Sequence, residues 1–195
     1  APRRLASRPT PGTGPGVVFL CDFLSDIPAT QAVFLEAWAR ERGRAFVRFD
    51  YTGHGASSGR FEDGAVGDWA RDAGDVVERL TEGPQILVGS SMGGWIALLL
   101  ATRRPGRVAG LIGIAAAPDF TEDGMWAEMT DAQRVELGER GVILAPSEYG
   151  DPYPITRRLI EDGRRQLMLR APLSLPFPVR LLHGSADADV PMTVA

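Results

Sequence analysis

A serine set among small residues, where a strand is predicted to turn into a helix, is the feature best suited to chemistry. Residues 89–93 match the pattern G-x-S-x-G, with Ser91 at its centre and Gly94 directly after it. A sharp turn of this kind holds the serine in a strained backbone conformation, so its neighbours must be small. The pattern predicts a nucleophile elbow that presents the Ser91 hydroxyl at the carboxyl edge of a sheet.

A second match to the same pattern, residues 55–59, lacks the flanking elements that such a turn needs. The Ser91 match follows a β-like apolar run at 85–88 and precedes an apolar helical pattern at 92–102. The match around Ser57 lies among turn residues and is followed by polar residues. We therefore expect Ser57 to be a loop serine.

A serine hydroxyl becomes a useful nucleophile only when a base accepts its proton. In sheets with this corner, an acid and then a histidine follow the serine along the chain. Asp187 lies in the loop after a predicted strand at 179–182, where its carboxylate would orient an imidazole. Asp189 and Asp119 are alternatives, and Asp187 could instead only cap the element that follows it.

The base should follow Asp187, but the chain has two histidines and both precede it. His54 and His183 are expected to be structural loop residues. The chain begins with Ala1 and ends in what resembles the opening of a helix. We therefore expect that a C-terminal strand and helix are missing, that the base lies beyond Ala195, and that residues 1–195 alone are inactive and poorly stable.

Acyl transfer also needs two backbone N–H groups directed at the developing oxyanion. Met92, the residue after the nucleophile, and Phe23, in the loop after the first long strand, are the predicted donors. A carboxylate turned toward an oxyanion would be unfavourable, so Asp22 is expected to point away. Cys21 is expected to be a buried strand-end residue.

The spacing of apolar residues predicts an α/β fold, a mostly parallel sheet with helices on both faces. Arg3 to Arg8 is expected to form an edge strand. Further predicted strands are 17–21, 45–49, 85–89, 108–116 and 179–182, and predicted helices are 32–42, 68–80 and 92–102.

The chain is expected to form one domain, 1–195, with a small helical cap inserted at about 118–177. No strand is obvious there, but helical patterns appear near 126–139 and 155–169. Met125, Trp126 and Met129 are candidates to line an acyl-binding site, although such a stripe is equally typical of plain core.

Composition excludes several other classes of protein. The net charge is −4, so nothing suggests a nucleic-acid partner, which would need clustered positive charge. All 21 basic residues are arginine, which indicates a composition bias and not a function. One cysteine cannot form an intramolecular disulfide, and no apolar run is long enough to span a membrane. The first sixteen residues do not read as a secretory signal. We expect a cytoplasmic, bacterial-like protein, or a mitochondrial matrix protein if the source is eukaryotic.

Four segments together, 20–26, 48–55, 83–95 and 180–191, resemble serine hydrolases of the α/β-hydrolase superfamily, within it a branch of acyl thioesterases and esterases. The resemblance implies hydrolysis of a small-molecule or acylated substrate without a cofactor or metal. It places the nucleophile on Ser91, the acid on Asp187 and the base beyond Ala195. Relatives usually carry glycine at one or both of the positions of Cys21 and Asp22, so the oxyanion loop departs from the family pattern.

Two other functions remain open at this level. A non-catalytic α/β-hydrolase-like binding module would fit the absent base and the altered oxyanion loop. A nucleotide-binding protein fits less well, because the chain lacks both G-x-G-x-x-G and G-x-x-x-x-G-K-[ST]. Epoxide hydrolase or dehalogenase chemistry is disfavoured, since those relatives carry aspartate at the nucleophile position. Acyl-chain preference, thioester versus ester preference and oligomeric state stay undetermined.

Overall fold

The central sheet has one antiparallel edge strand, and its other strands are parallel. The structure is a computed structural model that describes residues 3–24, 29–146 and 151–194. The strand order is β1-β3-β2-β4-β5-β8, with β1 antiparallel to β3. The strands are β1 (Ser7–Thr10), β2 (Thr13–Leu20), β3 (Arg44–Phe49), β4 (Gln85–Ser90), β5 (Val108–Ile114) and β8 (Val179–Leu182). This arrangement confirms the predicted α/β class.

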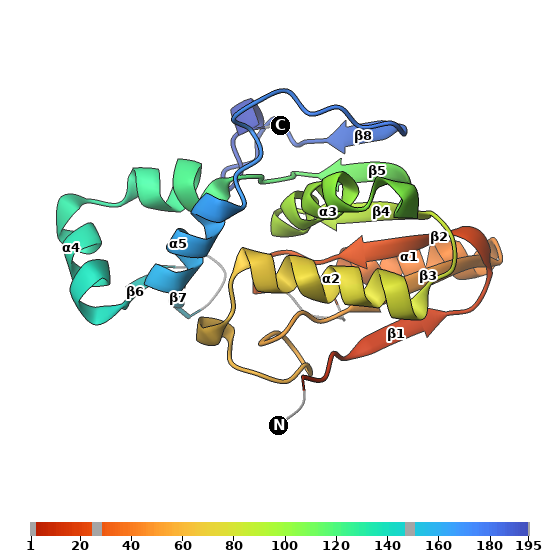
Figure 1. The fold of residues 1–195 in the computed structure, drawn as a ribbon, viewed down its shortest axis with the longest axis horizontal. Coiled ribbons are helices and arrows are strands. Elements are labelled where there is room, and N and C mark those ends of the chain that lie inside the picture. Colours follow the sequence, from red (N-terminus) through yellow and green to blue (C-terminus); the bar gives the residue numbers. More distant parts are fainter. Residues whose placement is uncertain (1–2, 25–28, 147–150, 195) are drawn as a thin grey trace.

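Helices cover both faces of the sheet. α1 (Thr30–Glu41) lies on one face, while α2 (Val66–Leu80) and α3 (Met92–Arg103) lie together on the other (Figure 1). Every residue of α3 from Met92 to Ala101 is buried. The reason is that α3 contacts β4 and β5 on one side and α2 on the other, which leaves little of it for solvent.

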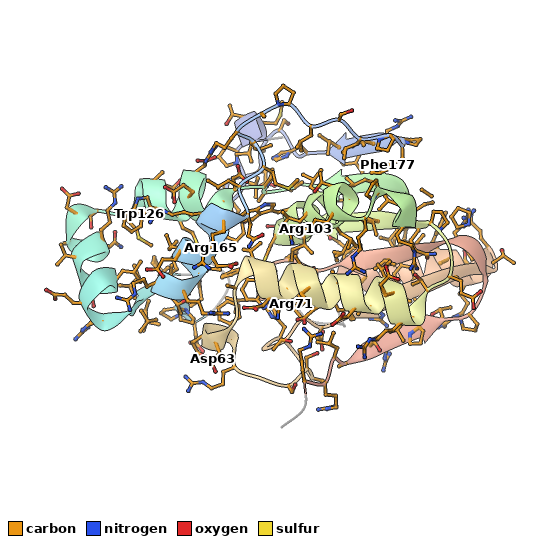
Figure 2. The ribbon with its side chains drawn as sticks, viewed as in Figure 1. Asp63, Arg71, Arg103, Trp126, Arg165 and Phe177 are labelled. Atoms are coloured by element: carbon orange, nitrogen blue, oxygen red, sulfur yellow. The ribbon has the colours of Figure 1, made fainter. Side chains whose placement is uncertain are left out.

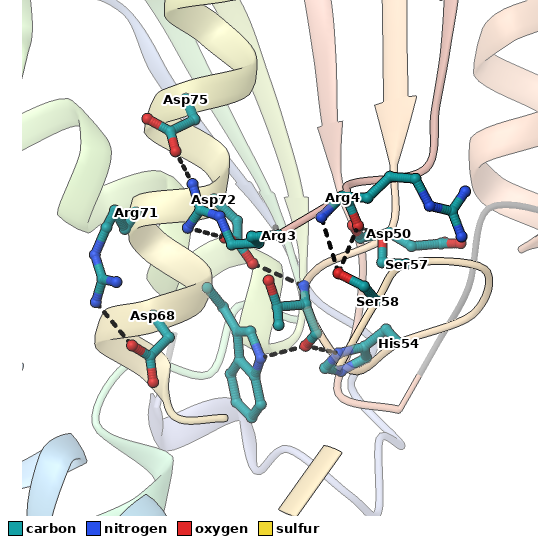
Figure 3. A network of polar contacts seen from close by, with 12 residues as sticks. Arg3, Arg4, Asp50, His54, Ser57, Ser58, Asp68, Arg71, Asp72 and Asp75 are labelled. Carbon is teal, nitrogen blue, oxygen red and sulfur yellow. Dashed lines mark hydrogen bonds and ion pairs between the residues drawn. The ribbon is translucent and has the colours of Figure 1, made fainter. Parts of the chain in front are cut away.

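The predicted edge strand exists but begins later than expected, at Ser7. Arg3 and Arg4 are used for other contacts. The Arg3 guanidinium donates to the buried Asp72 carboxylate at 2.6 Å, and the Arg4 N–H donates to the Ser58 hydroxyl at 2.8 Å (Figure 3). Pro9 lies within β1, where a missing N–H is tolerated because the strand has a neighbour on one side.

The segment between β5 and β8 contains two strands beside its helices, although no strand is obvious there in the sequence. β6 (Val142–Ala145) and β7 (Tyr153–Thr156) pair antiparallel. They join α4 (Asp131–Arg140), α5 (Arg157–Arg165) and a π-helical turn at Thr121–Trp126. β6 and β7 have only four residues each, and Pro154 lies within β7. Such short strands contain too few alternating apolar and polar residues to be predicted from the sequence. The helices and strands of this segment, α4, α5, β6 and β7, lie beyond the carboxyl ends of the parallel strands, and the chain after α5 runs back along the sheet to β8 (Figure 1).

A single helix predicted from Trp126 to Glu139 is divided in the structure. Thr130 starts α4 with a capping box, in which its hydroxyl accepts from the Gln133 N–H and the Gln133 side chain accepts from the Thr130 N–H. Gly141 ends the helix with φ +76°. The segment has a small core of its own, made of Met129, Leu137, Ile143, Ile155 and Ile160.

Asp119 fastens this inserted segment to the end of β5. Its carboxylate oxygens accept the backbone N–H groups of Met168 at 2.8 Å and of Leu169 at 2.9 Å. The Trp95 indole N–H also reaches the Gln166 carbonyl at 3.2 Å. Within the described residues, no helix is both long and apolar enough to cross a lipid bilayer.

Candidate active site

Ser91 stands at a strained corner between β4 and α3. Its backbone has φ +50° and ψ −117°, a conformation that residues with a Cβ rarely adopt. The turn is closed by contacts that only glycine allows. A Cβ on Gly89 would overlap the Gly93 carbonyl, one on Gly93 would overlap the Leu20 carbonyl, and one on Gly94 would overlap Ala116.

Backbone hydrogen bonds hold this corner to the neighbouring strand. The Ser91 N–H donates to the Ile114 carbonyl at 3.0 Å, and the Ser91 carbonyl accepts from Gly94 at 2.9 Å and from Ala117 at 3.0 Å. The Ser91 residue is only half-buried, whereas Ser90 and Met92 on either side of it are buried. The predicted strand–turn–helix corner is therefore present, with its serine accessible.

Ser57, in the second motif match, serves a loop. Its hydroxyl accepts the Ala6 N–H at 2.8 Å and donates to the Asp50 carbonyl at 2.7 Å (Figure 3). The first bond joins the N-terminal arm to the loop after β3, and the second lies within that loop. The prediction that Ser57 is a loop serine is confirmed.

Asp187 lies in the exposed loop after β8. Its Oδ1 accepts the N–H groups of Val190 at 2.9 Å and Asp189 at 3.0 Å. The Val190 N–H holds the pKa of Asp187 below its ordinary value, and the Asp189 N–H and the charge of His183 act in the same direction. The carboxylate thus stays ionised, with Oδ2 not engaged by these two N–H groups.

The two alternative acids have different surroundings. Asp119 is fully buried and both of its oxygens accept backbone N–H groups of the inserted segment. Asp189 acts electrostatically on the inserted segment: burial first, and then the charge of Asp189, raise the pKa of Tyr153. Of the three candidate acids, Asp119 therefore has a structural role, because it anchors the inserted segment.

Neither histidine is hydrogen-bonded to Ser91 in the described part of the chain. The buried His54 ring packs edge-to-face on Tyr51, Phe61 and Trp69, and its Nδ1 lies 3.3 Å from the Thr52 carbonyl. Burial lowers the pKa of His54 to about 4. The His183 Nε2–H donates to the Val190 carbonyl at 2.7 Å. Both imidazoles are held by local loop contacts, as predicted.

The two predicted oxyanion donors lie on the elements that flank the corner. Met92 is the first residue of α3, so its N–H has no partner within the helix. Phe23 follows β2, which pairs with β4. Its ring makes edge-to-face contacts, at 5.0 to 6.1 Å between centroids, with Phe61, Trp69, Phe120 and Tyr153. Residues 25–28 of this loop lie outside the described residues.

This ring cluster around Phe23 was not foreseen from the sequence. Its members come from five separate elements or loops, so no local spacing brings them together. Through it, Tyr153 of the inserted segment packs directly on the loop of the predicted oxyanion donor. The neighbouring Cys21 is buried at the end of β2, as expected.

The Asp22 side chain is turned into the protein, toward Ser90. Burial raises the pKa of Asp22, while a hydrogen bond with the Ser90 side chain acts to lower it. Asp22 Oδ1 is buried without a hydrogen-bond partner. A carboxyl therefore lies at the base of the corner that carries Ser91.

The three candidate acyl-site residues lie in different environments. Met129 is part of the inserted segment's own core. A core position is the alternative to acyl binding that the sequence left open. Trp126 lies beside α5 (Figure 2), and the guanidinium groups of Arg134 and Arg164 lie over its ring, 5.1 and 4.5 Å from the ring centroid. Met125 alone packs against both that core and the main core. Among the described residues, no three His, Cys, Asp or Glu side chains are grouped to hold a metal ion.

Sequence comparison finds a family and a curated relative. Residues 28–146 match the Hydrolase_4 family, described as serine aminopeptidase, S33. The mitochondrial palmitoyl-protein thioesterase ABHD10 of Bos taurus is 36% identical over 189 residues, which cover 96% of this chain and 61% of the relative. The chain thus spans about three fifths of the length of this curated relative.

Two solved structures are similar over almost the whole chain. The α/β-hydrolase domain-containing protein 10 from mouse is 36% identical, has a TM-score of 0.87, and is matched over 97% of this chain and 76% of that one. A putative hydrolase from Agrobacterium vitis is 38% identical with a TM-score of 0.94, over 98% and 77% of the two chains. The predicted resemblance to this thioesterase branch is confirmed.

Proposed function

We propose that this chain, which belongs to the Hydrolase_4 family of α/β-hydrolases, cleaves acyl esters or thioesters with Ser91 as the nucleophile. The observation that carries the proposal is the strained strand–turn–helix corner at Ser91. Ser91 has φ +50° at a corner closed by three glycines, and it remains accessible between buried neighbours. Strain of this kind costs about 1–3 kcal/mol and persists where the surrounding packing maintains it.

In the proposed reaction, the Ser91 hydroxyl attacks the acyl carbonyl and gives its proton to a base. The N–H groups of Met92 and Phe23 stabilise the oxyanion of the tetrahedral intermediate. The carbon–oxygen or carbon–sulfur bond then breaks, and the leaving alcohol or thiol takes the proton. Water attacks the acyl-serine ester with help from the same base, which releases the carboxylic acid and restores Ser91.

We assign the orienting acid to Asp187 and place the base histidine outside residues 1–195. Two N–H groups hold Asp187 Oδ1, so Oδ2 remains to accept an imidazole N–H. His54 and His183 are engaged in local contacts of their own. The chain covers 61% of the length of the curated relative, and we propose that a histidine outside residues 1–195 completes the triad.

The proposed substrate is an acyl thioester or a related ester, and residues 118–177 are proposed to act as a cap over it. The name of the Bos taurus relative supports the thioester class. The inserted segment lies beyond the carboxyl ends of the strands and contacts the Phe23 ring through Tyr153. Met125, which bridges the two cores, is the proposed acyl contact of this cap. The cellular compartment stays a prediction.

A fluorophosphonate probe on the natural full-length protein tests the proposal. We expect one covalent adduct on Ser91, located by peptide mass spectrometry, and none in Ser91→Ala. Ser57→Ala is the matched control, because it removes the serine of the second motif match and should label normally. Absence of an adduct on Ser91 in folded protein would exclude the nucleophile assignment.

A second candidate is a non-catalytic binding module of the same fold. It is favoured by one observation, that neither histidine within the described residues is hydrogen-bonded to Ser91. Calorimetric binding of a hydrolysis-resistant acyl thioether, combined with no turnover of the matching thioester, would support it. Turnover that is lost in Ser91→Ala would exclude it.

A further inference from the structure

A cavity of about 430 Å³ is formed by residues of α4, α5, β6 and β7, together with Glu62. Four arginines line it, one from α4 and three from α5: Arg140, Arg157, Arg158 and Arg165. Arg165 is the last residue of α5 (Figure 2). Among the described residues that line the cavity, none belongs to the corner at Ser91. The cavity is therefore separate from the site described above.

Two of these arginines carry charge that the fold does not neutralise closely. Arg140 and Arg158 each have a carboxylate partner, at 2.7 and 2.6 Å. The Arg157 guanidinium lies 3.8 Å from the Glu161 carboxylate and donates to a backbone carbonyl at 3.2 Å. Arg165 has no ion pair with any residue that the structure describes. The side chains of Arg157 and Arg165 are exposed, so both are available to a ligand.

The stability of α5 does not account for the arginines at its beginning. Its first turn contains Arg157 and Arg158 and no acid. The amino end of a helix carries partial positive charge, so cations there are unfavourable. Repulsion among like charges around one cavity adds to this cost. An anion bound in the cavity would offset both effects, because all of these charges would attract it.

Three acids also line the cavity, and one of them would compete with such an anion. They are Glu62, Glu161 and Asp162. Asp162 is used by the fold, since its Oδ2 accepts a backbone N–H of α2 at 2.7 Å. Glu161 stands between Arg157 and Arg165 on one face of α5, four residues from each. Its charge therefore opposes an anion that both arginines hold.

The cavity lies beside the elements that pack on the predicted oxyanion loop. Thr156 lines it, and Tyr153, three residues earlier in β7, contacts the Phe23 ring at 5.8 Å between centroids. Three residues of a strand span about 10 Å. Glu62 also lines the cavity, and the neighbouring Phe61 ring lies 5.0 Å from that of Phe23. A ligand whose reacting end is at the corner would need an extended arm to reach the cavity.

We propose that the cavity binds the anionic part of the leaving group, and that the preferred substrate is an acyl thioester of a carrier thiol that bears phosphate groups. Guanidinium groups bind phosphate oxygens through paired, charge-assisted hydrogen bonds. Arg157 and Arg165 stand about 12 Å apart along the helix axis, which suits a carrier with negative charge at two places. An extended arm between the thiol and the phosphates would span the distance from the corner. The inference rests on the proposed function of Ser91.

The test compares two thioesters with the same acyl group on the natural full-length protein. Butyryl-coenzyme A has a long carrier with phosphates, and butyryl-N-acetylcysteamine has a short, uncharged one. In Arg157→Ala and in Arg165→Ala, KM for the coenzyme A thioester should rise about three- to tenfold, the effect of losing a charge-assisted bond at an exposed site. The kcat should stay nearly constant, because the carrier contacts are the same in the ground state and the transition state. KM for the uncharged thioester should stay constant in both variants.

A variant with the opposite expected effect and a matched control sharpen the test. Glu161→Gln removes the competing charge, so KM for the coenzyme A thioester should fall about two- to threefold. Arg79→Ala removes an exposed arginine of α2 outside the cavity, with the same change in net charge, and should leave both KM values unchanged. Added salt should raise KM for the coenzyme A thioester only.

Any of three results would overturn the inference. The first is an equal rise of KM for both thioesters in the arginine variants, which would indicate a general disturbance of the inserted segment. The second is an unchanged KM for the coenzyme A thioester in those variants. The third is a wild-type protein that cleaves the uncharged thioester and not the other.

The proposed function is judged separately. Turnover of the uncharged thioester that is lost in Ser91→Ala shows that the proposed function stands, whatever the arginine variants do. A wild-type protein that cleaves neither thioester overturns the inference, and absence of Ser91 labelling as well overturns the proposed function.

Discussion

Gly93, in the first turn of α3, lies against the carbonyl oxygen of Leu20 at the end of β2 so closely that a Cβ would overlap it. This contact brings the helix that follows Ser91 against the strand that precedes Phe23. The relative placement of Ser91 and the loop after β2 therefore depends on the absence of a methyl group at Gly93. If α3 and β2 moved apart at this contact, the turn at Ser91 between β4 and α3 would open.

Gly93→Ala should destabilise the protein by about 1–3 kcal/mol or more, because the clash is with backbone and not with a movable side chain. Labelling of Ser91 should fall with it. Gly138→Ala is the matched control, since nothing lies within 4 Å of a Cβ there and Gly138 is inside α4. It should stabilise by about 0.5–1 kcal/mol. Equal stability of the two variants in urea denaturation would contradict the packing argument.

The buried pair of Glu36 and Arg48 should be the ion pair that matters most for stability. The Arg48 guanidinium lies 2.5 Å from Glu36, and both side chains are almost fully enclosed between α1 and β3. Glu36→Gln leaves a buried cation without this carboxylate, so we expect a loss of about 3–5 kcal/mol. Glu136→Gln, which breaks the exposed pair with Arg140, should cost at most about 0.5 kcal/mol. Chemical denaturation at pH 7 measures the free energy of unfolding of both variants. Similar losses in the two variants would show that burial does not determine how much each ion pair contributes.

The stability of the protein should fall when the pH drops below about 6.5, because of His54. Burial lowers the pKa of His54 from 6.5 to about 4 in the folded state. Between pH 6.5 and about pH 4, the unfolded chain binds a proton on His54 that the folded protein does not bind. The contribution of neutral His54 to stability is therefore full above pH 6.5 and is lost as the pH falls toward 4. The loss from this group is on the order of 3 kcal/mol.

Denaturation curves from pH 8 to pH 4.5 on wild type and His54→Gln would measure this contribution. The variant lacks the titrating ring, so its stability should change less over the same range, whatever its absolute value at pH 8. Parallel pH profiles for the two proteins would show that His54 is not responsible.

Loss of the Asp119 carboxylate should release the inserted segment from the sheet. In Asp119→Ala the N–H groups of Met168 and Leu169 lose their acceptors, and alanine must take the φ of +61° found at this position. We expect a loss of about 3 kcal/mol from these two effects together. Hydrogen exchange at residues 168–169 should become faster.

Asp123→Ala is the control for the previous prediction, because it removes an exposed carboxylate paired with Arg170 in the same segment. It should leave both stability and exchange nearly unchanged. Exchange at residues 168–169 that is equally slow in Asp119→Ala would mean that other contacts hold the segment.

Local patterns in the sequence determined the elements of the sheet and the corner at Ser91. β3, β4, α3 and β8 lie within a few residues of their predicted bounds, because apolar spacing reports directly on which face of an element is buried. The glycines around Ser91 predicted a tight turn, and the positive φ there follows from the same local chemistry.

Contacts between distant segments could be decided only by the tertiary structure. The β6–β7 pairing, the ion pair of Glu36 with Arg48, and the anchoring of Met168 by Asp119 join residues from 8 to 49 positions apart. Leu20 and Gly89 are paired because β2 and β4 are neighbours in the sheet, although α1, β3 and α2 separate them along the chain. Spacing along the chain encodes the backbone of each element, whereas the partner of a buried polar side chain depends on how the elements pack.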